Sequence, residues 1–320
     1  MEESSRIAEA DDGIRLDRWF RRHRPQLTHA LLEKYLRKGL IRLDGRKAKS
    51  SERVRAGQEI EVRIQDSGFR ERDSKPKTRS VNPEDAQFIQ DLVLYKDAHV
   101  IVINKPYGIP VQGGSKVARS IDGMLGGLTF DSKERPRLVH RLDRDTSGAL
   151  LLARDAKTAA KLAGAFAGKD IDKTYWALVN GAPLPPLGVI DLKLAKAAEG
   201  KFGREQMQVD EEGKRAVTEY RTLDALARKF ALLELKPLTG RTHQLRVHLA
   251  AIGCPILGDH KYGGASEDAS AIGVENILHL HARRIVIPAA IAGKAVDVKA
   301  PLPEHMKRSF LALGLDIPRN

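Results

Sequence analysis

Short apolar runs outnumber helical patterns from about residue 85 onward, and this imbalance constrains the fold most. Seven runs have the length and composition of strands: Leu92–Tyr95, Val100–Ile103, Leu150–Ala153, Tyr175–Val179, Ala216–Tyr220, Ala231–Leu235 and Ile285–Ile287. The helical patterns are Ala156–Ala167, Thr242–Ile252 and Glu304–Leu313. Because strands and helices do not alternate regularly, we expect an α+β fold with a mixed, mostly antiparallel sheet.

Positive charge is concentrated near the N-terminus. Residues 15–55 hold 14 Lys/Arg and 4 Asp/Glu, in a chain of 320 residues whose formal net charge is +13. An isoelectric point near 9.8 favours a polyanionic partner. The same block predicts two short helices and a small sheet. Its signals are an apolar patch at Leu16, Trp19 and Phe20, an N-cap at Thr28, a helix stop at Gly39, an Asp44-Gly45 turn and a strand through Ile60, Val62 and Ile64.

A charged segment at 66–82 (DSGFRERDSKPKTRSVN) has the composition of a linker. We therefore expect domains at 1–65, with a core of about 15–64, and at 85–320, joined by a linker at 66–84. No apolar stretch approaches the roughly 18–20 residues of a membrane span, and the N-terminus lacks the apolar core of a signal peptide. The single cysteine, Cys254, excludes an intramolecular disulfide. These features predict a cytoplasmic protein.

The densest polar cluster is Arg137–Gly148 (RLVHRLDRDTSG), followed at once by an apolar strand. A loop held in this way can aim a carboxylate into a cleft, and cationic neighbours favour the ionised aspartate that a nucleophile or base requires. Asp143 and Asp145 are both candidates. The alternative is a salt-bridged turn in which Asp145, Thr146 and Ser147 cap their own backbone, and spacing alone favours neither interpretation.

A second cluster, Thr239–Leu249 (TGRTHQLRVHL), has the pattern of a turn entering a helix, with stop signals at Gly253 and Pro255. One helix would present Arg241 and Arg246 near its N-terminal half. The helix dipole there favours a phosphate or a carboxylate. The alternative is a surface helix with ordinary solvated charges.

Metal and nucleotide chemistry find little support. His243, His248, His279 and His281 raise the question of a metal, but no His-Glu-x-x-His motif accompanies them. Neither a Walker A loop nor a dinucleotide-binding glycine motif occurs. We expect no metal and no cofactor.

The run His140–Gly148 (HRLDRDTSG) resembles the signature of the RluA branch of pseudouridine synthases. Residues 92–314 carry further blocks in the order of that family: Asn104–Gly108, Lys173–Ala177, Gly240–Leu249 and Gly258–Gly264. Residues 15–64 resemble the small S4-type RNA-binding domain, first seen in a small-subunit ribosomal protein. Residues 111–124 resemble the group that modifies several uridines of large-subunit ribosomal RNA.

The resemblance implies an isomerase that breaks the N1–C1′ bond of a uridine, rotates the uracil and rejoins it through C5 without a cofactor. Asp143 would be the catalytic aspartate, attacking either C1′ or the uracil ring, and Arg246 would pair with it. Arg141 would help to extrude the base and fill its place. Tyr175 would stack on the uracil and assist proton removal.

The resemblance also implies contacts to RNA, expected to be large-subunit ribosomal RNA, with no membrane and no required protein partner. In the catalytic part we expect substrate contacts from His140, Lys105, Arg241, Thr242 and His243. In the N-terminal part we expect RNA contacts from Arg18, Arg21, Arg22, Lys34, Arg37, Lys38 and Arg42. The sequence departs from the family at Tyr107, where a small residue is common, and at Arg144, where lysine is frequent.

Two other classes of function remain as alternatives. A non-catalytic RNA-binding assembly factor could use the same fold, since fold alone does not establish activity. The joint presence of Asp143, Tyr175 and Arg246 argues against that class. A metal-dependent nuclease or phosphodiesterase that uses the His and Asp groups is the other alternative, and it predicts loss of activity with a chelator and recovery with a divalent ion.

Overall fold

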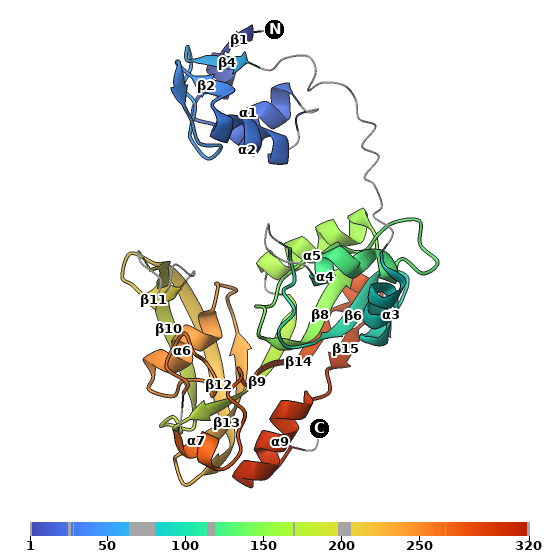
Figure 1. Cartoon of the computed structure of the whole chain (residues 1–320), viewed down its shortest axis with the longest axis vertical. Helices are drawn as coiled ribbons and strands as arrows, with labels where there is room; N and C mark the ends of the chain where they lie inside the picture. Colours follow the sequence, from blue (N-terminus) through green and yellow to red (C-terminus); the bar gives the residue numbers. More distant parts are fainter. Residues whose placement is uncertain are drawn as a thin grey trace. The chain divides into compact units, whose positions relative to one another are not determined.

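The computed structural model of the chain describes residues 2–24, 27, 29–63, 81–113, 119–168, 170–197, 206–265 and 267–318. They belong to two compact units, Met1–Lys77 and Thr78–Asn320 (Figure 1). Most of the expected linker at 66–84 lies outside the described residues, so the domain boundaries stay predictions. Among the described helices, none is both long and apolar enough to cross a bilayer.

The first unit packs two helices on an antiparallel sheet of order β1-β4-β2-β3. Its elements are β1 (Glu2–Arg6), η1 (Glu9–Asp11), α1 (Leu16–His23), α2 (His29–Lys38), β2 (Ile41–Leu43), β3 (Arg46–Lys47) and β4 (Glu59–Arg63). Phe20 of α1 and Leu32 of α2 pack in one buried cluster with Ile41 and Ile60 of the sheet. Burial of this apolar face holds the small unit together.

Local signals in the first unit are confirmed. Gly39 ends α2 with a φ of 70°. Asp44 and Gly45, at φ 48° and 71°, both adopt the left-handed backbone that a two-residue hairpin turn requires. The expected N-cap Thr28 and strand residue Ile64 lie outside the described residues. The sequence pattern missed β1, because its residues (EESSR) are all polar.

The second unit contains every strand and helix expected from the sequence. Its strands are β5 (Val93–Lys96), β6 (Val100–Lys105), β7 (Arg137–Leu138), β8 (Ser147–Ala153), β9 (Asp172–Asn180), β10 (Leu187–Lys196), β11 (Met207–Val209), β12 (Lys214–Leu226), β13 (Phe230–Pro237), β14 (Leu280–Ile287) and β15 (Val296–Lys299). Its helices are α3 (Pro83–Asp91), α4 (Ile121–Met124), η3 (Leu125–Leu128), α5 (Ala156–Gly168), α6 (Gln244–Ala251), α7 (Glu267–Ala271), α8 (Ala289–Ala292) and α9 (Glu304–Leu313).

The strands form one 11-stranded sheet whose main path is β11-β10-β12-β13-β9-β14-β8-β6-β5, with β15 paired to β14 and β7 to β8. Among the described strands, only β8 and β14 run parallel. The expected α+β fold with a mixed, mostly antiparallel sheet is therefore confirmed. Strand β10 was not predicted, although Ile190, Leu192 and Leu194 alternate there with charged residues.

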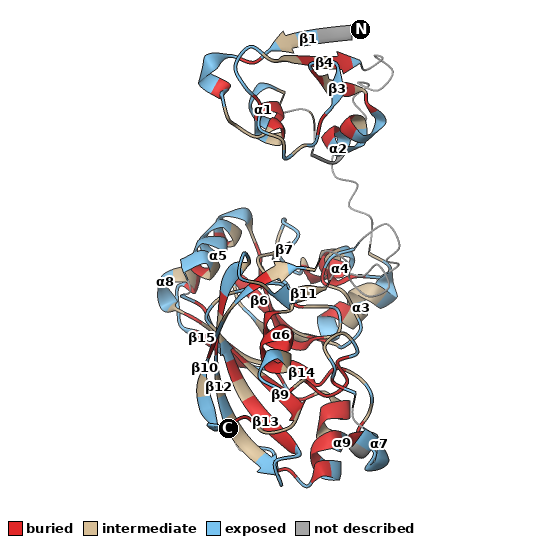
Figure 2. Ribbon diagram, turned by 90° about the vertical axis from the view of Figure 1, so that its left-hand side faces the viewer, coloured by how far each residue is buried: buried red, intermediate tan, exposed pale blue. Residues whose placement is uncertain are grey.

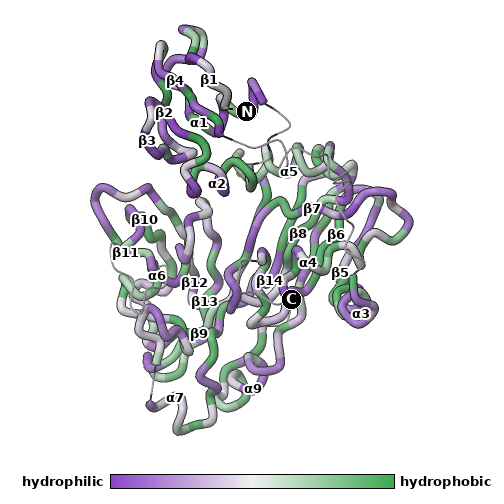
Figure 3. The backbone as a smooth tube through the Cα atoms, turned by 45° about the horizontal axis from the view of Figure 1, so that its top comes forward, coloured by the Kyte–Doolittle hydropathy of each residue, from purple (hydrophilic) through white to green (hydrophobic). Residues whose placement is uncertain are grey.

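Both faces of the central strands are buried, which explains their continuous apolar sequences (Figures 2 and 3). On β6, Val100 and Val102 face α5 and α8, whereas Ile101 and Ile103 face α3 and α4. On β9 and β13, one face packs on α6 and the other on α9. Helices therefore cover both faces of the sheet in each of its halves. Strands β9, β14 and β8 join the two halves.

Candidate active site

The loop between β7 and β8 carries Asp143 to the start of a strand that is buried along its whole length. The backbone N–H of Thr146 donates to the Asp143 carbonyl oxygen at 3.2 Å, which closes a turn. Gly148 follows with a φ of 108°, and a Cβ atom there would lie 2.3 Å from the carbonyl oxygen of Ala282 on β14. Only glycine allows this approach. It sets the start of β8 and hence the position of Asp143.

A cavity of about 860 Å³ opens beside Asp143. Its walls come from the Asp143 loop, the start of β9, the continuous segment from the end of β13 into α6, and β14, so distant parts of the sequence meet there. Most of the predicted catalytic-domain residues line it: His140, Arg141, Asp143, Tyr175, Arg241, Thr242, His243 and Arg246. Its volume lies in the usual range of small-molecule sites.

Arg246 has two carboxylate neighbours, and the nearer one is not the residue that the sequence suggested. Its Nε and Nη2 donate to Asp259 at 2.7 and 2.6 Å, in a buried bidentate pair. Its Nη1 lies 3.8 Å from Oδ2 of Asp143, whose side chain is 23% exposed. Two unit charges at this separation attract by about 4 kcal/mol at an effective dielectric constant of ~20. The expected pairing is present, but Asp259 holds the guanidinium in place.

The charge on Arg246 is secured by these acids. Burial opposes the charge, but the hydrogen-bonded Asp259 carboxylate, with Asp143 behind it, raises the pKa of Arg246 above its ordinary value. Asp259 also accepts the backbone N–H of Lys261 at 3.0 Å. Its oxygens are therefore satisfied although the side chain is fully buried.

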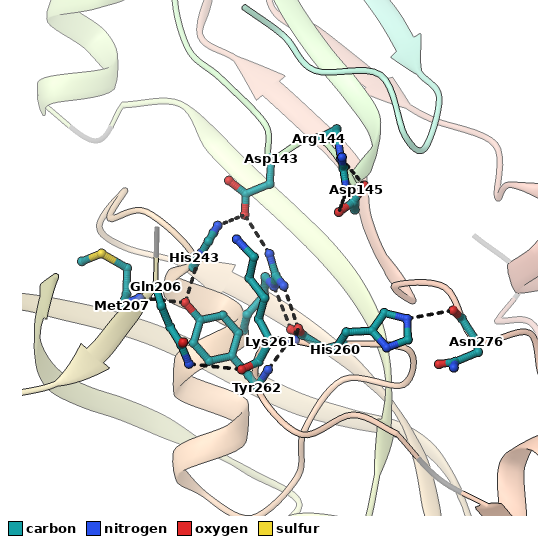
Figure 4. Close-up of polar contacts among 12 residues, drawn as sticks. Asp143, Arg144, Asp145, Gln206, Met207, His243, His260, Lys261, Tyr262 and Asn276 are labelled. Carbon is teal, nitrogen blue, oxygen red and sulfur yellow. Dashed lines mark hydrogen bonds and ion pairs between the residues drawn. The ribbon is translucent and has the colours of Figure 1, made fainter. Parts of the chain in front are cut away.

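His243 is the second neighbour of Asp143, and Figure 4 shows it between Asp143 and Tyr262. Its Nε2 lies 3.8 Å from Oδ2 of Asp143. Its Nδ1 lies 2.7 Å from the Tyr262 hydroxyl oxygen. Burial lowers the pKa of His243, against the attraction of Asp143. The structure thus places His243, which was predicted as a substrate contact, beside Asp143, the predicted catalytic residue.

Tyr175 lies on β9, between β13 and β14, and lines the cavity. Burial, and after it the charge of Asp143, raises the pKa of its phenol above the ordinary value. The ring is therefore a neutral, polar-edged aromatic surface at physiological pH. Such a surface can stack on a base.

Two predicted contact residues have mainly internal partners. The Lys105 side chain is completely buried, and its ammonium donates to the carbonyls of Pro106 and Arg144 at 2.8 and 2.9 Å. Burial lowers its pKa to about 7. Lys105 does not line the cavity, so it supports the Asp143 loop from beneath. His140 lines the cavity, but its Nε2 accepts the Leu151 backbone N–H at 2.8 Å, and burial lowers its pKa to about 3.

Asp145, the competing aspartate, pairs with Arg144 at 2.9 Å and does not line the cavity. The salt bridge of the turn alternative is therefore present. The described residues show no hydrogen bond from the Thr146 or Ser147 backbone to this carboxylate, which the same alternative suggested. The prediction that one helix presents Arg241 is wrong, because α6 begins at Gln244. Arg241 lies in the preceding turn, exposed beside Thr242.

The basic residues of the first unit are mostly exposed. Arg18, Arg21, Lys34, Arg37 and Lys38 lie on the solvent-facing sides of α1 and α2. The other two have partners that hold them in place. Arg22 pairs with buried Asp11 at 2.8 Å, and Arg42 donates to the Gly39 and Gly45 carbonyls at 3.3 and 3.0 Å.

Metal ligation is not apparent in the parts of the chain that the structure describes, where no group of three or more His, Cys, Asp or Glu could hold an ion. His248, His279 and His281 are buried in the core.

Asp259 and Tyr262 were not among the predicted site residues. A signal was present, because both lie in a turn bounded by Gly258 and Gly264. A Cβ at either glycine would lie within 2 Å of a backbone carbonyl oxygen. Glycines at both ends of a short polar segment indicate a closely packed turn, a position suited to orienting other side chains.

Comparisons with known proteins identify relatives of this chain. The RNA pseudouridylate synthase family model matches residues 99–251. The chain is 36% identical over 298 residues to ribosomal large subunit pseudouridine synthase C of Rickettsia bellii, covering 92% of this chain and 96% of that protein. It is 33% identical to the mitochondrial RNA pseudouridine synthase 4 of Arabidopsis thaliana, covering 92% of this chain and 78% of that protein.

A solved human structure shows the same architecture. Human RNA pseudouridylate synthase domain containing 4 matches with a TM-score of 0.63 and 32% identity, covering 73% of this chain and 97% of that one. The similarity in sequence spans nearly the whole chain. This chain belongs to the RNA pseudouridine synthase family, within its RluA-type branch.

Proposed function

We propose that the protein isomerises specific uridines of large-subunit ribosomal RNA to pseudouridine, with Asp143 as the catalytic aspartate. The observation that carries the proposal is the place of this carboxylate, on a cavity wall and 3.8 Å from both Arg246 and His243. The choice of RNA follows the relatives whose names include the large ribosomal subunit.

The reaction asks little beyond what the cavity holds. The N1–C1′ bond breaks, a C1′–C5 bond forms, C5 loses its proton and N1 gains one, so no group or electron is supplied from outside. The uridine must leave its stack to reach Asp143. Tyr175 offers its ring to the flipped uracil, and Arg141 is an exposed cation at the cavity that can occupy the vacated place. Attack on C1′ and attack on the uracil ring are both compatible with this arrangement.

The first unit is proposed to be an S4-like RNA anchor. The exposed cations of α1 and α2 support this role, since binding to a phosphate backbone requires accessible positive charge. A cytoplasmic location, expected from the sequence, belongs to the same proposal.

Replacement of the carboxylate tests the function. Full-length protein is incubated with ribosomal RNA transcribed with uridine tritiated at C5, because formation of the C1′–C5 bond releases that tritium. Asp143→Asn is expected to lower the release rate by roughly 10³-fold or more while RNA binding persists. Asp145→Asn, as a matched control, should stay within a few-fold of wild type. Full activity of Asp143→Asn would refute the assigned role.

The same assay separates the alternative class. A wild-type protein that binds ribosomal RNA tightly but releases no tritium would be a non-catalytic assembly factor. A site-by-site pseudouridine map of ribosomal RNA, with and without the protein, then identifies the uridines.

A further inference from the structure

Arg246 and His243, which both lie 3.8 Å from Asp143, are each held by a residue of one turn, residues 258–264. Asp259 of this turn binds Arg246. Tyr262 of the same turn binds His243 (Figure 4). The Cζ atom of Arg246 also lies over the Tyr262 ring, 5.1 Å from the ring centroid. The turn therefore orients a permanent cation and an imidazole toward the same carboxylate.

Hydrogen bonding to Tyr262 decides which ring nitrogen carries the proton. The hydroxyl oxygen of Tyr262 accepts the Met207 backbone N–H at 2.9 Å. Its own hydrogen then has one acceptor among the described residues, Nδ1 of His243 at 2.7 Å. An Nδ1 that accepts leaves the ring hydrogen on Nε2, the atom that faces Asp143.

The charges around the ring favour its neutral form. Burial disfavours a charge, and Arg246 and Lys261 repel one, while Asp143 and Asp259 attract it. The balance places the pKa of His243 below its ordinary value. His243 also adopts a left-handed backbone, with φ 52° and ψ 18°, immediately before α6. Strain of this kind persists where surrounding contacts enforce it, and it often occurs at functional sites.

We propose that His243 is a positioning residue for Asp143, a neutral imidazole fixed by Tyr262 with its Nε2–H toward Oδ2. This inference rests on the proposed function. Catalytic hydrogen bonds are often long without substrate, and the 3.8 Å separation is expected to close when RNA binds. Arg246 then provides the positive charge that faces Asp143, and His243 provides a hydrogen bond that orients the carboxylate. A neutral donor aligns the carboxylate and withdraws less electron density from it than a second cation would.

A tautomer measurement tests the geometry without RNA. In full-length protein labelled with ¹⁵N-histidine, the ring-nitrogen shifts of His243, assigned with His243→Gln, should show a neutral ring protonated at Nε2. Tyr262→Phe should yield a mixture of tautomers. Tyr220→Phe on β12, which removes a hydroxyl that donates to the Pro185 carbonyl, should leave the signal unchanged. A ring protonated at Nδ1, or doubly protonated at pH 7.5, would overturn the proposal.

Kinetics of tritium release test the role. Asparagine at position 243 adopts the left-handed backbone readily, but its shorter side chain cannot bring a donor as close to Asp143. The kcat of His243→Asn should therefore fall roughly 10-fold or more with KM unchanged. His243→Gln keeps a donor near Nε2 and should recover part of that loss. A fall in the Tyr262→Phe kcat should accompany the change in tautomer. Thermal unfolding of each variant confirms that it is folded.

The outcomes separate the two hypotheses. A His243→Asn variant with wild-type kcat, or one in which only KM rises, overturns the positioning role and indicates a substrate contact instead. A wild-type protein that releases no tritium overturns the proposed function, and the role of His243 with it. In an active protein, adding His243→Asn to Asp143→Asn should have no further effect, because the group that His243 positions is already gone.

Discussion

Removal of the Asp259 carboxylate would reveal how much of the site depends on the ion pair behind it. Asp259 accepts from Arg246 at 2.6 and 2.7 Å and from the Lys261 backbone at 3.0 Å, and its side chain is fully buried. Asp259→Ala leaves a buried guanidinium whose remaining carboxylate neighbour is Asp143. Breaking a buried pair on one side typically costs about 3–5 kcal/mol. We expect a loss of that size in the free energy of unfolding.

Urea unfolding of the full chain measures this loss. In a Trp19→Phe background, Trp176 becomes the sole tryptophan and reports on the second unit. Asp297→Ala, which breaks an exposed pair, is the control and should cost less than about 1 kcal/mol. The double variant Arg246→Met with Asp259→Leu should regain most of the stability but remain at least ~10²-fold less active. A cost below about 1 kcal/mol for Asp259→Ala would refute this reasoning.

Three further predictions follow from other parts of the structure. Burial lowers the pKa of His281 to about 4, so the unfolded state binds its proton first and stability falls as pH drops from about 6.5 toward 4. Between pH 7.5 and 5, the free energy of unfolding measured by urea titration should fall by roughly 2 kcal/mol less in His281→Asn than in the wild type. An unchanged pH dependence would contradict this. Gly148→Ala should cost more than about 3 kcal/mol in thermal unfolding, because its backbone is left-handed and β14 lies against it, whereas Gly164→Ala should be neutral or stabilising. Replacing Lys34 and Arg37 with Gln should reduce the slope of log K against log salt for RNA binding by about 0.7–0.9 per lost phosphate contact, and an identical slope would show that α2 does not contact RNA.

Local physics made much of the fold predictable. The Asp44-Gly45 turn, the end of α2 at Gly39 and the apolar strands all follow from backbone preference and burial over a few residues. The polar strand β1 escaped this reasoning because its pairing with β4 depends on backbone hydrogen bonds, which leave no mark in a sequence. The order of the sheet likewise depends on contacts between distant segments.

The site was predictable to a similar depth. The predicted residues that line the cavity came from three recognisable motifs, but the residues that hold them in place were not predicted. Nothing near Arg246 in the sequence indicates that Asp259 binds it more closely than Asp143 does. Lys105 was expected to touch substrate, and only the three-dimensional structure shows it buried beneath the loop. The exposure of a side chain and its additional partners depend on tertiary contacts, so short-range sequence patterns do not reveal them.

Asp143 and the groups that orient it come from opposite halves of the sheet, joined through β9, β14 and β8. The aspartate loop follows β7, whereas Arg246 and the turn at 258–264 follow β13. A growing chain on the ribosome therefore carries its nucleophile candidate more than 100 residues before the guanidinium that must face it. A nascent fragment that ends before β14 lacks the strand that pairs with both β8 and β9, so the halves of the sheet that carry Asp143 and Arg246 are not yet joined.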